Sequence, residues 1–99
     1  MYVVYGKITL FLPYCSSLKE KRKIVLSIVD RVRKRFNVSI AEVDDHELWQ
    51  RCSLGFAAVT AKHAEIESII EAVYSSMDRH INQLQILSFH YDITRPSDK

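Results

Sequence analysis

Residues 17–36 constrain the fold most, because they combine a helix start signal, an apolar stripe and most of the positive charge. Ser17 and Glu20 have the spacing of a capping box, in which each side chain binds a free backbone N–H at the start of a helix. Apolar residues then recur at steps of seven, three, four, three and four: Leu18, Val25, Ile28, Val29, Val32 and Phe36. This spacing places them on one face of an α-helix, so the sequence predicts a helix with a buried apolar face.

The same stretch carries eight of the chain's 14 basic residues: Lys19, Lys21, Arg22, Lys23, Arg31, Arg33, Lys34 and Arg35. Only Glu20 and Asp30 oppose them. We expect an outer face containing Lys19, Lys23, Arg31 and Lys34. Such a face can bind nucleic-acid phosphates by releasing counterions. A solvated surface that keeps a small protein in solution is the alternative, and it is the commoner explanation of charge runs.

The remaining segments alternate between strand and helix patterns. Strands are expected over residues 2–12, 38–43, 51–61 and 84–93, and a second helix over 63–83. The apolar stripe of that helix is Ile66, Ile69, Ile70, Val73, Met77 and Ile81. The order β-α-β-β-α-β predicts an α+β, ferredoxin-like fold. Right-handed crossovers place both helices on one face of a four-stranded antiparallel sheet, with the first and third strands central.

A chain of 99 residues is too short for two ordinary hydrophobic cores. We therefore expect a single domain over residues 1–94, followed by a polar tail at 95–99. The formal net charge is only +2, so the local clustering of charge matters more than the total.

The uncovered face of the predicted sheet carries Tyr5 and Phe11 among polar residues. Monomers seldom leave a sizeable apolar patch in water, so this face is expected to form a dimer interface or a ligand surface. Trp49 with Arg51 lies at the connection between the second and third strands. Trp and Arg are enriched at binding hot spots, although a Trp49 ring folded over the end of the sheet is the favoured interpretation and a dimer contact comes next. These four residues are the interface candidates of an expected homodimer.

The sequence indicates a cytoplasmic protein. Its N-terminus lacks the basic region of a signal peptide, and no apolar run approaches the roughly 20 residues that span a bilayer. Cys15 and Cys52 fit no disulfide framework or metal spacing, so free thiols in a reducing compartment are expected. We expect neither membrane association nor sequence readout of DNA.

No catalytic motif is visible, and neither an enzyme nor a cofactor is expected. Residues 44–47 and the scattered His63, His80 and His90 lack the spacing of a metal or acid–base site. Cys15 could be a reactive thiol whose pKa is lowered by the helix N-terminus and nearby lysines, but no paired base accompanies it. Residues 12–16 lack the glycine-rich, arginine-containing phosphate loop of acylphosphatases.

The sheet also matches RNA-recognition motifs poorly. Those domains stack bases on aromatic residues of the first and third strands. In the third strand Phe56 is the only aromatic residue, and Ala58 stands where the second ring would be. Core packing or a dimer contact is the better interpretation of Phe56.

Three blocks carry a resemblance to a known family: SLKEKR at 17–22, FNVSIAEV at 36–43, and LWQR at 48–51 followed by Leu54-Gly55. In this order they resemble the YlxP-like family of small bacterial proteins, over about residues 1–92. The resemblance implies a ferredoxin-like fold, a bacterial source, and genes that neighbour those for translation initiation and ribosome maturation. It implies no reaction, because none is established for the family.

The leading hypothesis is a non-enzymatic module that binds RNA or a ribosomal particle through its basic first helix. The alternative is a homodimeric structural or protein-interaction module with no nucleic-acid role. An enzyme or small-ligand sensor would require a deep pocket with converging polar groups. The sequence does not identify the RNA or protein partner, the sheet face or edge that dimerises, or a role for the two cysteines.

Overall fold

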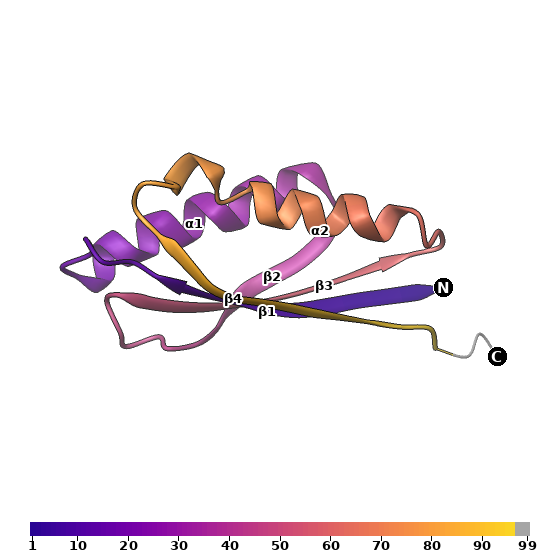
Figure 1. Ribbon diagram of the computed structural model, residues 1–99, viewed down its shortest axis with the longest axis horizontal. Coiled ribbons are helices and arrows are strands. Elements are labelled where there is room, and N and C mark those ends of the chain that lie inside the picture. The colour runs from indigo at the N-terminus through magenta and orange to yellow at the C-terminus, as the bar shows by residue number, and fades with distance from the viewer. Residues whose placement is uncertain (97–99) are drawn as a thin grey trace.

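The computed structural model describes residues 1–96 and has two layers, with both helices packed on the same face of one sheet (Figure 1). The elements follow in the order β1 (Tyr2–Phe11), α1 (Leu18–Arg35), β2 (Val38–Asp44), β3 (Arg51–Thr60), α2 (Glu65–Ser75), the short 3₁₀ helix η1 (Asp78–His80) and β4 (Gln85–Thr94). This is the predicted βαββαβ order, so the α+β, ferredoxin-like fold is confirmed.

The sheet has the strand order β2-β3-β1-β4, and every neighbouring pair is antiparallel. β1 and β3 are central, as predicted, and pair without interruption from Tyr2–Thr60 to Phe11–Arg51. β4 and β2 form the two edges. Each edge strand has an irregular register, between Thr9 and Leu10 along the β1–β4 pair and between Glu42 and Asp44 along the β2–β3 pair.

α1 begins as the sequence predicts. The Ser17 hydroxyl accepts the backbone N–H of Glu20 at 3.1 Å. The Glu20 carboxylate bonds the N–H and hydroxyl of Ser16, both at 2.9 Å, one residue earlier than in a standard capping box. The apolar stripe then buries Val25, Ile28, Val29 and Val32 against the sheet. The helix ends at Phe36, whose backbone is extended.

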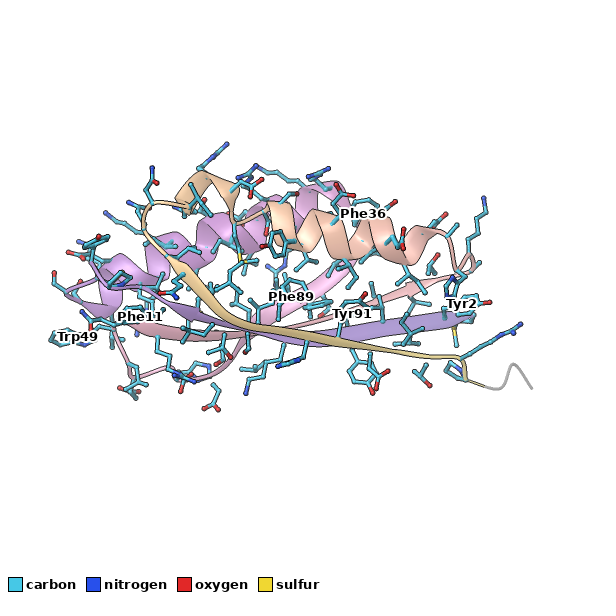
Figure 2. All side chains as sticks on the ribbon, viewed as in Figure 1. Tyr2, Phe11, Phe36, Trp49, Phe89 and Tyr91 are labelled. Atoms are coloured by element: carbon cyan, nitrogen blue, oxygen red, sulfur yellow. The ribbon has the colours of Figure 1, made fainter. Side chains whose placement is uncertain are left out.

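The hydrophobic core lies between the helices and the sheet. Its central side chains include Ile8, Leu10 and Leu54, all without exposed surface. Phe56 is also buried on this face, with 4% of its surface exposed, so its core assignment is confirmed. Phe56 pairs with Gly6 across β1 and β3. The ring of Phe89, which β4 places between the sheet and the helices (Figure 2), packs beside Phe56 with ring centroids 5.9 Å apart.

α2 is shorter than predicted, and the expectation of a helix continuing to residue 83 is wrong. The Ser75 and Ser76 hydroxyls donate to the Ala72 and Val73 carbonyls at 3.3 and 2.5 Å. Such bonds compete with helix continuation, and the chain turns through η1 into β4. Ile81, predicted to be buried, is consequently 62% exposed.

The predicted tail at 95–99 is described only in part. Arg95 lies over the Tyr2 ring, 5.3 Å from its centroid, whereas residues 97–99 lie outside the described residues. Neither helix within residues 1–96 combines the length and apolar character needed to cross a membrane.

Candidate functional site

The solvent side of α1 presents a surface that we call the basic face: Lys19, Arg22, Lys23, Arg33 and Lys34, all exposed. An 18-residue helix is about 27 Å long, and these cations lie near its two ends, three at residues 19–23 and two at residues 33–34. None of the five forms a salt bridge within residues 1–96. Of the two opposing acids of α1, Glu20 is already bonded to Ser16.

Three arginines of α1 also hold neighbouring elements. Arg31 and Arg35 donate to the Ser76 carbonyl and the Ser75 hydroxyl at the end of α2, at 3.4 and 2.9 Å. Arg33 donates to the Ile40 carbonyl of β2 at 3.1 Å. Arg31 is half-buried, so its predicted place on the outer face of the helix is wrong. Arg33 and Arg35 stay exposed.

Lys21 does not belong to this surface. Its side chain is 1% exposed, and its ammonium forms a 2.8 Å salt bridge with Glu42. The same nitrogen donates to the carbonyls of Asp45, His46 and Arg51 at 2.9, 3.1 and 3.4 Å. A buried ammonium with four acceptors cannot reach a phosphate, so the prediction that Lys21 binds nucleic acid is wrong. It instead holds the β2–β3 connection against α1.

The helix period could have identified this buried position. Lys21 precedes Val25 by four residues and Ile28 by seven, which places it on the apolar stripe. Glu42 lies on the helix-facing side of β2, opposite Leu54. A lysine and a glutamate at two core-facing positions form a charge pair that sequence reasoning overlooked.

The β2–β3 connection is further fixed by Asp45, which adopts a positive φ of 64°. Its carboxylate accepts bonds from the Ser53 hydroxyl at 2.8 Å and from Arg51 Nε at 3.2 Å. These contacts, the Ser53 bond foremost, lower the pKa of Asp45. Residues 44–47 thus form a structured turn, and Arg51 is engaged within it.

The interface candidates lie at two places. Trp49 is 53% exposed and lies with Phe11 at one end of the molecule (Figure 2). Together with Arg51 they line a cavity of about 480 Å³. Tyr5 lies on the open face of the sheet, 47% exposed, together with Val59 and Leu87. The structure therefore brings Phe11, Trp49 and Arg51 together and leaves Tyr5 separate.

A second cavity, of about 340 Å³, lies beside the start of α1 and was not foreseen. Its walls come from the β1–α1 loop, α1 and the segment after α2: Tyr14, Cys15, Glu20, Lys23, Ile24, His80 and Gln83. His80 is fixed by contacts of Nδ1 with the Gln83 amide oxygen at 2.9 Å and of Nε2 with the Ser27 hydroxyl at 3.0 Å. Residues from segments far apart in sequence meet here, which no local motif could signal.

The two free cysteines are buried. Burial, followed by the nearby Glu20 charge, raises the pKa of Cys15, so the predicted lowering is wrong. Burial raises the pKa of Cys52 to about 12. Both thiols are protonated near neutral pH and poorly nucleophilic. No cluster of three or more potential metal ligands occurs in residues 1–96.

Comparison with solved structures supports the fold alone. The designed protein Foldit4 has a TM-score of 0.58 and 11% identity, with 98% of this chain and 100% of that chain covered. The designed protein LFR1 1, with a ferredoxin fold, has a TM-score of 0.54 and 16% identity, with 100% and 89% covered.

Sequence comparison gives the family. The uncharacterized protein YlxP of Bacillus subtilis (strain 168) is 42% identical over 62 residues, which cover 63% of this chain and 67% of that protein. The profile of the family described as "Protein of unknown function (DUF503)" matches residues 3–91. The chain therefore belongs to the DUF503 family, whose function is not established.

Proposed function

We propose that this protein is a non-enzymatic module of the cytoplasm that binds RNA, free or within a ribosomal particle, through the basic face of α1. The observation that carries the proposal is the exposure of five cations along one helix, none of which is in a salt bridge within residues 1–96. Their charges can meet phosphates, although Arg33 also donates to the Ile40 carbonyl, and counterion release supplies affinity without sequence readout. Two free, buried cysteines are consistent with a reducing compartment.

Shape and rigidity support the same surface. Among residues 1–96, no other element covers the five cations of the basic face, which are all exposed. The helix is held by its core stripe, by Lys21 beneath it and by arginine bonds to α2 and β2. A helix fixed in this way loses little backbone freedom when its cations meet an extended polyanion.

The test measures binding of purified protein to bulk RNA and to ribosomal subunits across a salt series. The double variant Lys19→Glu/Lys34→Glu reverses two exposed charges on the basic face. Its matched control is Lys7→Glu/Lys62→Glu, which changes the net charge equally at two exposed lysines away from α1. We expect the α1 variant to lose at least about tenfold in affinity and the control to lose much less. Circular dichroism of both variants checks that they fold.

Two results would overturn the proposal. One is wild-type protein that binds neither RNA nor subunits at low salt. The other is equal weakening by the two double variants, because binding would then follow total charge rather than the basic face.

A homodimer formed through β4 and the open sheet face is a second candidate function. β4 is a ten-residue edge strand that is largely exposed, with Leu87, Tyr91 and Ile93 each more than a third exposed. Exposed edge strands of this length pair readily with another chain, and Tyr5 lies on the neighbouring strand. Sedimentation equilibrium at micromolar concentration tests it. We expect a dimer that Tyr91→Pro dissociates, because residue 91 presents its backbone N–H to the free edge of β4, whereas the His90 carbonyl faces β1. A monomeric wild type would rule the dimer out.

A further inference from the structure

The cavity beside the start of α1 adjoins the basic face, because Lys23 belongs to both. Tyr14 lies at its rim and is 76% exposed, an unusual position for an aromatic ring that covers no core. At about 340 Å³ the cavity is at the small end of ligand sites. A group of one or two rings fits this volume, and a longer ligand must continue outside it.

The walls of the cavity disfavour an anionic group. Cys15 keeps its proton because burial raises the pKa of its thiol, and Ile24 adds apolar surface. Glu20 lines the cavity as a carboxylate whose pKa is lowered by its bonds to Ser16. This fixed negative charge repels a phosphate inside the cavity, whereas Lys23 can hold one at the rim.

The cavity also offers one hydrogen-bond donor and one acceptor, from Gln83 and Glu20. His80 Nδ1 contacts the Gln83 amide oxygen, which leaves the amide NH₂ of Gln83 without a hydrogen-bond partner among residues 1–96. That NH₂ can donate to a ring nitrogen or carbonyl oxygen. The Glu20 carboxylate can accept from an exocyclic amine, the pairing that acidic side chains make with cytosine N4. A planar ligand that both donates and accepts along one edge satisfies both groups.

We propose that this cavity binds one unpaired RNA base, stacked on Tyr14, and that it prefers bases with an exocyclic amino group. The proposal deepens the proposed function and rests on it, since the phosphates flanking the base would lie on the basic face. Proteins that read RNA typically stack splayed bases on aromatic rings and bond their edges. Uracil, which lacks the amino group, should bind less tightly than adenine, cytosine or guanine.

The experiment compares an RNA hairpin that carries a single-nucleotide bulge with the same hairpin without the bulge. Fluorescence anisotropy gives the affinity of each for the full-length protein. Tyr14→Ala removes the ring, Tyr14→Phe keeps it, and Tyr74→Ala removes another exposed ring from α2, away from the cavity. The bulge is then varied through all four bases.

We expect the bulged hairpin to bind more tightly, and Tyr14→Ala to weaken only that RNA, by about five- to a hundredfold, the range for loss of one base–aromatic stack. Tyr14→Phe and Tyr74→Ala should leave the affinity within about twofold of wild type. Equal binding of bulged and plain hairpins, unaffected by Tyr14→Ala but weakened by Lys19→Glu/Lys34→Glu, would overturn the base site and leave the proposed function standing. Binding of neither hairpin at low salt would overturn both. A bulged uridine that binds as tightly as adenosine and cytidine would overturn the base preference.

Discussion

Lys21 is predicted from the sequence to bind RNA, but in the structure it is a buried member of an ion pair. It sits in a basic run, but its ammonium has four acceptors and 1% exposure. Removing one partner of a buried ion pair leaves the other charge uncompensated, which costs several kcal/mol. The pair thus contributes to specifying where the β2–β3 connection lies.

We predict that Lys21→Met lowers the free energy of unfolding by about 3 kcal/mol, measured by urea denaturation. Lys19→Met, at an exposed position of the same helix, should change it by less than about 0.5 kcal/mol. The double variant Lys21→Met/Glu42→Leu should be more stable than Lys21→Met, because no unpaired carboxylate is left. A Lys21→Met protein as stable as wild type would contradict the structural role.

The raised pKa of Cys52 predicts that the stability of the protein decreases at alkaline pH. Its pKa is about 12 in the folded protein, compared with an ordinary thiol value of 9.0. Between these pH values the unfolded chain loses the thiol proton while the folded chain keeps it. Stability is therefore fully present below pH 9 and falls as the pH rises towards 12, by up to about 1.4 kcal/mol per pH unit from this group.

Cys52→Ala isolates the Cys52 contribution among the other groups that titrate at alkaline pH. The variant is expected to be less stable near neutral pH, because it leaves a small cavity, but its unfolding free energy should decline less steeply above pH 9. Denaturant unfolding at several pH values measures both slopes. Parallel slopes for the variant and wild type would show that the Cys52 pKa is not raised in the folded protein.

At the scale of elements, periodicity predicted the helices and strands whose bounds depend on interactions between residues close in sequence. The α1 stripe, the Ser17 cap and the alternation of β1 and β3 each depend on neighbouring residues, so their boundaries agree with the structure within about two residues. The end of α2 was missed because it depends on the Ser75 and Ser76 hydroxyls and on the path into β4.

The candidate site was less predictable for the same reason. Charge clustering on α1 is visible in sequence, and so is the exposure of most of its cations. The pocket was not, because it needs Tyr14, Glu20 and His80 from three separate segments. The contacts of Arg31 and Lys21 are equally long-range. Periodicity indicates that Lys21 and Glu42 face the core, but it does not indicate that they pair.

The two glycines of the sheet, Gly6 and Gly55, should differ in how much stability the protein loses when each is replaced by alanine, because their neighbours differ. A Cβ at Gly6 would lie 2.4 Å from the His90 carbonyl oxygen and 2.7 Å from the Phe56 ring, so the β4 backbone must move. At Gly55 the close neighbour is the Val43 side chain, at 2.7 Å, which is 52% exposed and can move into solvent.

We therefore expect Gly6→Ala to lower the free energy of unfolding by about 2 kcal/mol, within the range for overpacking. Gly55→Ala is the matched control and should cost clearly less. Thermal and urea unfolding of both variants check the order. Equal losses would mean that β4 can shift away from β1 without cost.

For the whole molecule, the two-layer architecture separates the proposed surfaces. The helices cover one face of the sheet (Figure 1), so the basic face of α1 and the open sheet face with Tyr5 point in different directions. RNA binding and dimerisation can then coexist. A dimer through β4 would present two basic faces to one RNA, and binding would gain from bivalency only if the RNA spans both.

The salt dependence of RNA binding reports how many phosphates the protein neutralises, and not its total charge. The logarithm of the binding constant falls linearly with the logarithm of salt concentration, with a slope of about 0.7–0.9 per neutralised phosphate. Lys19→Gln and Lys34→Gln should each reduce the slope by about that amount, and their effects should add. Lys62→Gln, an exposed lysine in the β3–α2 loop, should leave the slope unchanged. If all three variants reduced the slope alike, RNA affinity would depend on the net charge of the protein. The phosphates would then not be bound specifically by the basic face of α1.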